Sequence, residues 1–414
     1  MCGQTETKNS RYEKCRNDII KELHGRIDMS RDVPDTEIQE LIDDMVVRFG
    51  KEYTLSLKER QELSNEIFYS IRKLDILQEL VDAPDVTEIM VNGTDNIFIE
   101  KAGRLIKYEK SFESRQKLED VIQQIVAKCN RAVNEASPIV DARLENGSRV
   151  NIVLAPVALN GPIVTIRRFP EHPISMEDLI NFGSITQEAA DKLRKLVLAG
   201  YNIFISGGTG SGKTTFLNAL SHYIPKTERI ITIEDSAELQ LQELPNLVRL
   251  ETRNANADGV REISIRDLIK SSLRMRPDRI IVGEVRGGEA IDMLQALNTG
   301  HDGSLSTGHA NSSKDMLTRL ETMVLMGMEL PLAAVRRQIA SGVDIIVHLG
   351  RLRDKSRRVL EIAEVTGYED GEITIRPVYE FEETGEANGR IQGEFIRKNE
   401  LLHRRKLEAA GLEW

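Results

Sequence analysis

The chain is poor in several features that mark particular classes of protein. Of its 414 residues, 5% are aromatic, three are cysteine and one is tryptophan. The cysteines are odd in number and never spaced C-x-x-C, which argues against a disulfide framework and against a zinc site. A basic excess is also missing, since 56 Lys and Arg face 66 Asp and Glu for a net charge of -10. Because binders of nucleic acid are normally basic, this balance argues against that class.

Long apolar segments are missing from the sequence as well. No run approaches the roughly 20 consecutive apolar residues that span a bilayer. The N-terminal segment MCGQTETKNSRYEKCRNDII is polar and charged throughout, without the apolar core of a signal peptide. What remains is an ordinary globular composition, 40% hydrophobic and 29% charged. We therefore expect a cytosolic protein.

Patterning along the chain predicts five consecutive parts. Residues 1–75 show charged helices with apolar positions three and four apart, and residues 76–170 show the mixed signals of a small α+β domain. Residues 171–185, with two prolines at or beside them, are the best candidate for a linker. Residues 186–350 alternate helix and strand, which indicates an α/β domain with a parallel sheet between helices. Residues 351–414 are β-rich, and we expect a C-terminal appendix there.

The segment GGTGSGKTT matches the phosphate-loop pattern G-x-x-x-x-G-K-[ST], between an apolar strand and an apolar-faced helix. Glycines let consecutive backbone N–H groups surround an anion, and the helix N-terminus adds partial positive charge. We expect Lys213 to reach the β- and γ-phosphates of ATP, and Thr214 to ligate Mg²⁺. The predicted nucleotide-binding residues are Gly207, Gly208, Thr209, Gly210, Ser211, Gly212, Lys213, Thr214 and Thr215.

A phosphate loop alone fits a kinase, a GTPase, a helicase or a motor, and nearby carboxylates narrow the choice. Glu284 follows a β-type run, so it should emerge at the carboxyl edge of the sheet, where phosphates bind. There it could polarise the attacking water or hold it through a magnesium-bound water. Glu234, with Asp235 and Glu238 close by, should open on the same edge. Either carboxylate could instead be an ordinary charge favoured by a helix dipole.

Two histidines, His301 and His309, lie in the glycine-rich segment TGHDGSLSTGHANSS. Each follows a Thr-Gly pair, in a tight loop that a phosphate could approach closely. Asp302 is the only other good metal ligand in the segment, so we expect no metal site there. A structural role and a role beside the nucleotide both fit this pattern.

Four segments in order resemble the signature boxes of the secretion-superfamily ATPases: GGTGSGKTT, TIEDSAELQL, RPDRIIVGEVRGGEA and TGHDGSLSTGHANS. They match the phosphate loop, the acidic box, the variant Walker B box and the histidine box of that family, which powers type II and type IV secretion and type IV pili. Upstream, DVTEIMVNGTDNIFIEKAGRL and DARLENGSRVNIVLAPVALNGPIVTIRRF are most similar to the CpaF/TadA-type ATPases of the tight-adherence (Flp) pilus system. The resemblance covers residues 76–350 well and both ends loosely.

This resemblance implies a RecA-like P-loop NTPase domain in a homohexamer that couples ATP hydrolysis to assembly or retraction of a pilus. Glu284 then matches the catalytic glutamate, which could also hold Mg²⁺ through water, and Glu234 matches the acidic-box carboxylate. His301 and His309 match the histidine box. The implied partners are inner-membrane platform proteins, with peripheral contact at the cytoplasmic face of the membrane and no nucleic acid.

Arginines of the N-terminal domain complete the resemblance. Arg149, Arg167 and Arg168 match the arginines that reach across to the γ-phosphate in the family, and Arg286 is a weaker candidate. Guanidinium groups on adjacent strands suit bidentate phosphate binding. Without the resemblance, the same residues would equally fit a solvated strand face.

Other interpretations stay open. The family's four-cysteine zinc module is missing here, which disfavours the type II secretion and pilus-extension branch. A hub ATPase of a type IV secretion system is the nearest alternative, followed by a RecA-like nucleic-acid translocase and by an adaptor that binds ATP and barely hydrolyses it. The basic run at 336–358 fits either a solvated loop or a surface that docks on acidic protein loops or anionic lipid.

Overall fold

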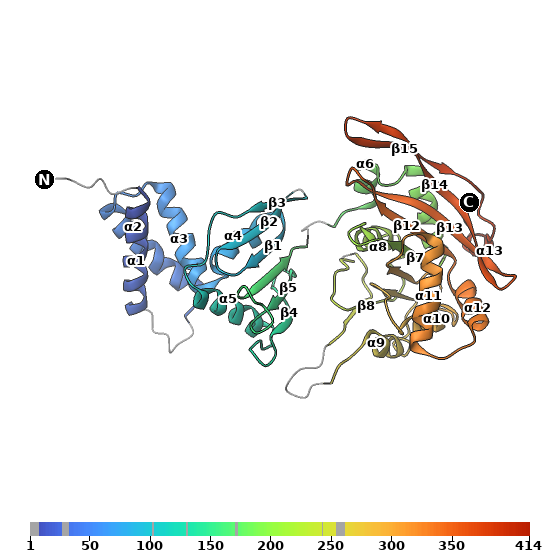
Figure 1. Cartoon of the computed structure of the whole chain (residues 1–414), viewed down its shortest axis with the longest axis horizontal. Coiled ribbons are helices and arrows are strands. Elements are labelled where there is room, and N and C mark those ends of the chain that lie inside the picture. Colours follow the sequence, from blue (N-terminus) through green and yellow to red (C-terminus); the bar gives the residue numbers. More distant parts are fainter. Residues whose placement is uncertain are drawn as a thin grey trace. The chain divides into compact units, whose positions relative to one another are not determined.

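The computed structural model describes residues 8–26, 33–101, 103–129, 131–169, 173–241, 243–253 and 261–414. The chain divides into two compact units, Met1–Glu171 and His172–Trp414 (Figure 1). Within the described ranges, we find no helix that combines the length and the apolar character needed to cross a membrane.

Unit 1 opens with three helices, α1 (Lys8–Arg26), α2 (Asp35–Glu52) and α3 (Leu57–Arg72). They share a small core of their own, which includes Ile19, Leu23, Ile38, Ile42, Leu63 and Ile67. The spacing of apolar residues predicted helices in this part of the chain. A capping box starts α3, because Ser56 accepts the backbone N–H of Glu59 while the Glu59 carboxylate accepts that of Ser56.

The rest of unit 1 is an antiparallel sheet with helices on one face. Its strands are β1 (Val86–Asn92), β2 (Asn96–Lys101), β3 (Arg104–Lys107), β4 (Ile139–Arg143), β5 (Arg149–Val153) and β6 (Ile163–Arg167), in the order β3-β2-β1-β6-β5-β4. The covering helices are η1 (Asp75–Leu77), α4 (Gln78–Asp82) and α5 (Arg115–Lys128). Alternate strand residues point into this core, and the other face of the sheet carries a mixture of polar, charged and apolar side chains.

Unit 2 is built on one nine-stranded sheet with the order β15-β14-β13-β12-β7-β11-β10-β8-β9. The parallel part contains β7 (Ile203–Gly207), β8 (Ile230–Glu234), β9 (Leu247–Glu251), β10 (Arg279–Val282), β11 (Leu305–Gly308) and β12 (Ile345–Arg351). Three antiparallel strands extend it: β13 (Arg357–Glu369), β14 (Glu372–Ala387) and β15 (Arg390–Arg397). The β-rich tail is therefore continuous with the main sheet, because β13 pairs directly with β12.

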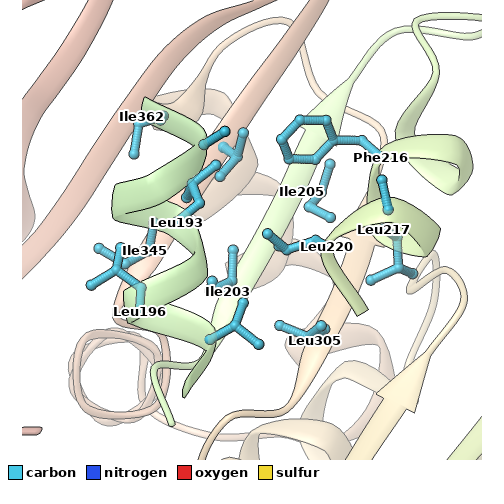
Figure 2. Packing of buried hydrophobic residues seen from close by; sticks show 14 of the residues in the cluster. Leu193, Leu196, Ile203, Ile205, Phe216, Leu217, Leu220, Leu305, Ile345 and Ile362 are labelled. Carbon is cyan, nitrogen blue, oxygen red and sulfur yellow. The ribbon is translucent and has the colours of Figure 1, made fainter. Parts of the chain in front are cut away.

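Helices cover both faces of this sheet and form two cores. One core contains α6 (Met176–Asn181), α7 (Gln187–Leu198) and α8 (Lys213–Ser221); in Figure 2, α7 and α8 pack side chains against β7 through Ile203 and Ile205. The other contains α9 (Ile265–Ser272), α10 (Ala290–Leu297), α11 (Ser313–Gly327) and α12 (Leu332–Gly342). Helix α13 (Arg405–Ala409) lies near the C-terminus. The predicted linker contains α6, and its Met176 and Leu179 belong to the first core.

Candidate functional site

The glycine-rich loop joins the end of β7 to the start of α8, as the sequence predicted. A Cβ atom on Gly207 would lie 2.5 Å from the carbonyl oxygen of Leu349 on the neighbouring strand. Gly210 and Gly212 have φ of 71° and 95°, which side chains rarely adopt. The loop therefore needs glycine at these positions, and it ends at a helix N-terminus that favours an anion.

Lys213 lies inside this loop and is 8% exposed. Its Nζ donates to the carbonyl oxygens of Gly207 and Gly208, both at 3.1 Å, and lies 3.3 Å from Nδ1 of His309. Burial lowers the pKa of Lys213, and the nearby Glu284 carboxylate opposes that shift. The ammonium is thus held where an anion bound by the loop would meet it.

Glu284 and His309 come together beside the loop, at the carboxyl edge of the sheet. Nε2 of His309 lies 2.9 Å from Oε1 of Glu284. Burial, followed by the charge of Lys213, lowers the pKa of His309, so its ring is neutral near pH 7. Because the Lys213 ammonium can only donate, Nδ1 accepts from it and Nε2 carries the proton toward Glu284. The three side chains form one hydrogen-bonded series.

Glu234 ends β8 and is 3% exposed. Its Oε1 accepts the backbone N–H groups of Glu238 and Leu239, at 2.8 and 3.0 Å, whereas its Oε2 has no hydrogen-bond partner among the described residues. Burial raises the pKa of Glu234 to about 7. A Cβ on Gly283 would lie 2.9 Å from Cγ of Glu234, so glycine there leaves room for this side chain. The acidic box therefore lies directly beside the peptide that precedes Glu284.

Oxygen ligands are available for Mg²⁺. Thr214 and Thr215 occupy the first turn of α8, next to Lys213, and Glu284 supplies a carboxylate at the same edge. Within the described parts of the chain, no cluster of three or more His, Cys, Asp or Glu could hold a metal. A site with few protein ligands suits Mg²⁺, which is usually bound by one or two side chains together with substrate phosphates and water.

The two histidines of the glycine-rich segment are not brought together. His301 precedes β11, at the amino edge of the sheet, and its Nδ1 lies 3.2 Å from the carbonyl oxygen of Ala296. His309 follows β11 at the opposite edge. Because a strand crosses the sheet between them, similar local sequence places them at opposite ends. Only His309 adjoins the phosphate loop in unit 2.

Arginines predicted in unit 1 occupy different environments. Arg149 and Arg167 face each other across β5 and β6, with Arg143 opposite Arg149 on β4. These three lie in one row on the face of the sheet away from the core, and Arg167 pairs with Glu88 on β1. The strand register therefore gathers three guanidinium groups beside the carboxylate of Glu88. Arg143 is an addition that only the strand register reveals.

Arg168 has a structural environment. Its guanidinium donates to the carbonyl oxygen of Val86 at 2.8 Å and also to that of Ala83. It therefore ties the end of β6 to the start of β1. Arg286, the weaker candidate in unit 2, forms an ion pair with Asp235 in the acidic box.

Two of the seven basic residues in the run at 336–358 form ion pairs within unit 2. Arg336 and Arg353 each form ion pairs with two glutamates. Arg357 lies beside the phosphate loop, since a Cβ on Gly212 would be 3.6 Å from its Cδ. Arg336 and Arg353 therefore have local partners, and docking through the rest of the run stays a prediction.

Comparisons with known proteins agree with this geometry. The family model described as type II/IV secretion system protein matches residues 71–392. A Mycobacterium tuberculosis protein named for conjugal transfer is 36% identical over 294 residues, 70% of this chain and 83% of its own length. The type IV secretion system protein PtlH of Bordetella pertussis is 33% identical over 324 residues, 72% of this chain and 94% of its own.

Among solved structures, the Legionella pneumophila ATPase DotB is 21% identical with a TM-score of 0.51, over 71% of this chain and 80% of its own. That likeness concerns the fold, and it confirms the predicted RecA-like architecture. The chain belongs to the type II/IV secretion system protein family and is an ATPase.

Proposed function

We propose that this chain is the motor of a pilus-assembly or secretion machine, acting as a homohexamer on Mg²⁺ and ATP. It would work at the cytoplasmic face of the inner membrane, in peripheral contact with the membrane and with platform proteins. The hydrogen-bonded series of Lys213, His309 and Glu284 beside the phosphate loop carries this proposal. Together they provide a cation that binds phosphate, a histidine that orients the carboxylate, and a base, all at one point.

Each group has a distinct role in the proposed hydrolysis. Lys213 would exchange its bonds to loop carbonyls for bonds to the β- and γ-phosphates. Glu284 would accept the proton of the attacking water, and His309 would hold that carboxylate by donating from Nε2. Thr214 would ligate Mg²⁺, which neutralises phosphate charge when bound, with Glu284 reaching it through water. Glu234, at the end of the neighbouring strand β8, would place a second carboxylate beside this site.

Two systems are candidates for the machine. The upstream segments of unit 1 support a tight-adherence (Flp) pilus motor of the CpaF/TadA type. The names of the relatives, which refer to conjugal transfer and type IV secretion, support a secretion hub ATPase equally well. Transport of nucleic acid by this chain itself finds less support, because its net charge is -10.

Loss of the gene from its host should abolish one measurable output of such a machine. A deletion strain is expected to lose surface pili if the chain drives a pilus, or to lose conjugal transfer or protein export if it is a secretion hub. The wild-type gene should restore that output, and a Glu284→Gln gene should not. Electron microscopy of cells, mating frequency and the secreted proteins are the readouts. A deletion strain that retains all three outputs would refute the proposed function.

The arginine row, formed by Arg143, Arg149 and Arg167, should affect the turnover of ATP more than its binding. If Arg149 and Arg167 contact the γ-phosphate only after domain closure, alanine at either position should lower kcat by about 100-fold or more. The Kd for ATP should change by less than about 3-fold, because that contact forms late. Arg104→Ala, on the exposed strand β3 of the same sheet, is the control and should leave both values unchanged. Equal losses of kcat and affinity would instead indicate a ground-state contact.

A further inference from the structure

The phosphate loop borders a cavity of about 520 Å³ within unit 2. Gly208 and Thr209 of the loop form one wall, and His309 forms another. Its remaining lining comes from the segment after His309 and from α11: Ala310, Asn311, Asp315, Thr318, Arg319 and Thr322. The cavity is thus bounded by the phosphate loop and by His309, the side chain that contacts Glu284.

Among the described residues that line this cavity, Arg319 is the only lysine or arginine. It is exposed on α11 and makes no hydrogen bond or ion pair with any residue that the structure describes. Its charge reaches the site, since it contributes to lowering the pKa of His309 after burial and Lys213. Asp315, one turn earlier on the same helix, is the only carboxylate that the structure describes in the lining. Arg319 is therefore available to an incoming anion.

The helix that carries Arg319 is firmly placed. Met316, Leu317 and Leu320 bury its inner face in the second core. At its end, a Cβ on Gly327 would lie 2.2 Å from the carbonyl oxygen of Gly288, in the loop that follows Glu284. Helix α11 thus packs against the segment that positions the carboxylate. This packing holds the backbone of Arg319 in place, and its side chain is exposed.

We propose that Arg319 binds the terminal phosphate of ATP from within its own subunit, and the inorganic phosphate released by hydrolysis. A guanidinium offers a fork of donors that fits two phosphate oxygens. The loop residues, the hydroxyl groups of Thr318 and Thr322 and the amide of Asn311 supply further polar partners in the same cavity. Arg319 would therefore distinguish ATP from ADP. This inference rests on the proposed nucleotide site.

The test compares nucleotides that differ in the terminal phosphate. Calorimetry on the full chain would give Kd for ADP and for a non-hydrolysable ATP analogue. Arg319→Ala should weaken the analogue by about 10-fold or more, because charge-assisted hydrogen bonds are lost. ADP should bind within about 3-fold of wild type, and Arg319→Lys should recover part of the loss. Lys314→Ala removes an exposed charge from the same helix outside the cavity, and it should change neither value.

Other outcomes would overturn the proposal. Equal weakening of both nucleotides, or of neither, would exclude a contact with the terminal phosphate. A smaller oligomer in light scattering, with unchanged Kd values, would assign Arg319 to contact with another copy of the chain. If the wild-type chain bound neither nucleotide, the proposed nucleotide site would fail together with this inference. If the wild type binds both and Arg319→Ala still prefers ATP to the same degree, only the inference fails.

Discussion

A Glu284→Gln variant should bind ATP as tightly as the wild type and turn it over about 10²- to 10⁴-fold more slowly. The carboxylate acts on water in the transition state, so its loss affects kcat and leaves ground-state binding intact. Glutamine keeps the size of the side chain and can still accept the hydrogen bond from Nε2 of His309, which lies 2.9 Å from Oε1. The geometry of the site is preserved while the base is removed.

Lys213→Ala is the matched comparison, because Lys213 contacts phosphate before any chemistry occurs. It should abolish ATP binding itself, since it removes the buried charge at the centre of the loop. Calorimetry with ATP and steady-state release of phosphate would separate the two effects. A Glu284→Gln variant with turnover within about 3-fold of wild type would refute the assignment of Glu284 as the base.

The phosphate loop and the position of Glu284 were predictable because their signals are local. A strand, a glycine-rich turn and a helix follow one another directly, and a residue just after a parallel strand must emerge at the carboxyl edge. The hydrogen-bonded series of Lys213, His309 and Glu284 was not predictable from the sequence. It depends on β11 lying between β7 and β10, which brings His309 to both Lys213 and Glu284.

Residues that sequence reasoning missed depend on pairing between distant segments. Arg143 joins the arginine row only through the register of β4 with β5, and Arg319 enters through the packing of α11. The tail was predicted as β-rich, but its continuity with the main sheet depends on β12 and β13 pairing across a short loop. His301 shows the opposite case. Its local sequence resembles that of His309, but strand β11 lies between the two histidines, so His301 lies at the other edge of the sheet.

Glu234 should make the stability of unit 2 fall as pH rises. Its pKa is about 7 in the folded chain against an ordinary value of 4.5. Between these values the folded state retains a proton that the unfolded chain has released, so rising pH favours unfolding. The loss in the free energy of unfolding grows from about pH 4.5 to about pH 7 and then levels off, at about 3 kcal/mol in total. Glu234→Gln should remove this dependence.

Trp414 provides the readout, because it is the only tryptophan and packs against the first core of unit 2. Denaturant titrations followed by its fluorescence at pH 5 and pH 8 would give the free energy of unfolding at each pH. Glu177→Gln, at an exposed position of α6 in the same unit, is the control and should retain the pH dependence of the wild type. An identical pH dependence in Glu234→Gln would assign the effect to another group.

The Glu234→Gln variant also tests why the chain keeps a buried carboxyl group that lowers its stability. Glutamine can keep an acceptor for the backbone N–H groups of Glu238 and Leu239, and it cannot ionise. We therefore expect Glu234→Gln to be more stable than the wild type at pH 8. If its ATP turnover also falls, the ionised carboxylate serves hydrolysis at the expense of stability, as active-site charges often do. If turnover is unchanged while stability rises, Glu234 has no part in catalysis, and the acidic box would only shape the strand end beside Gly283.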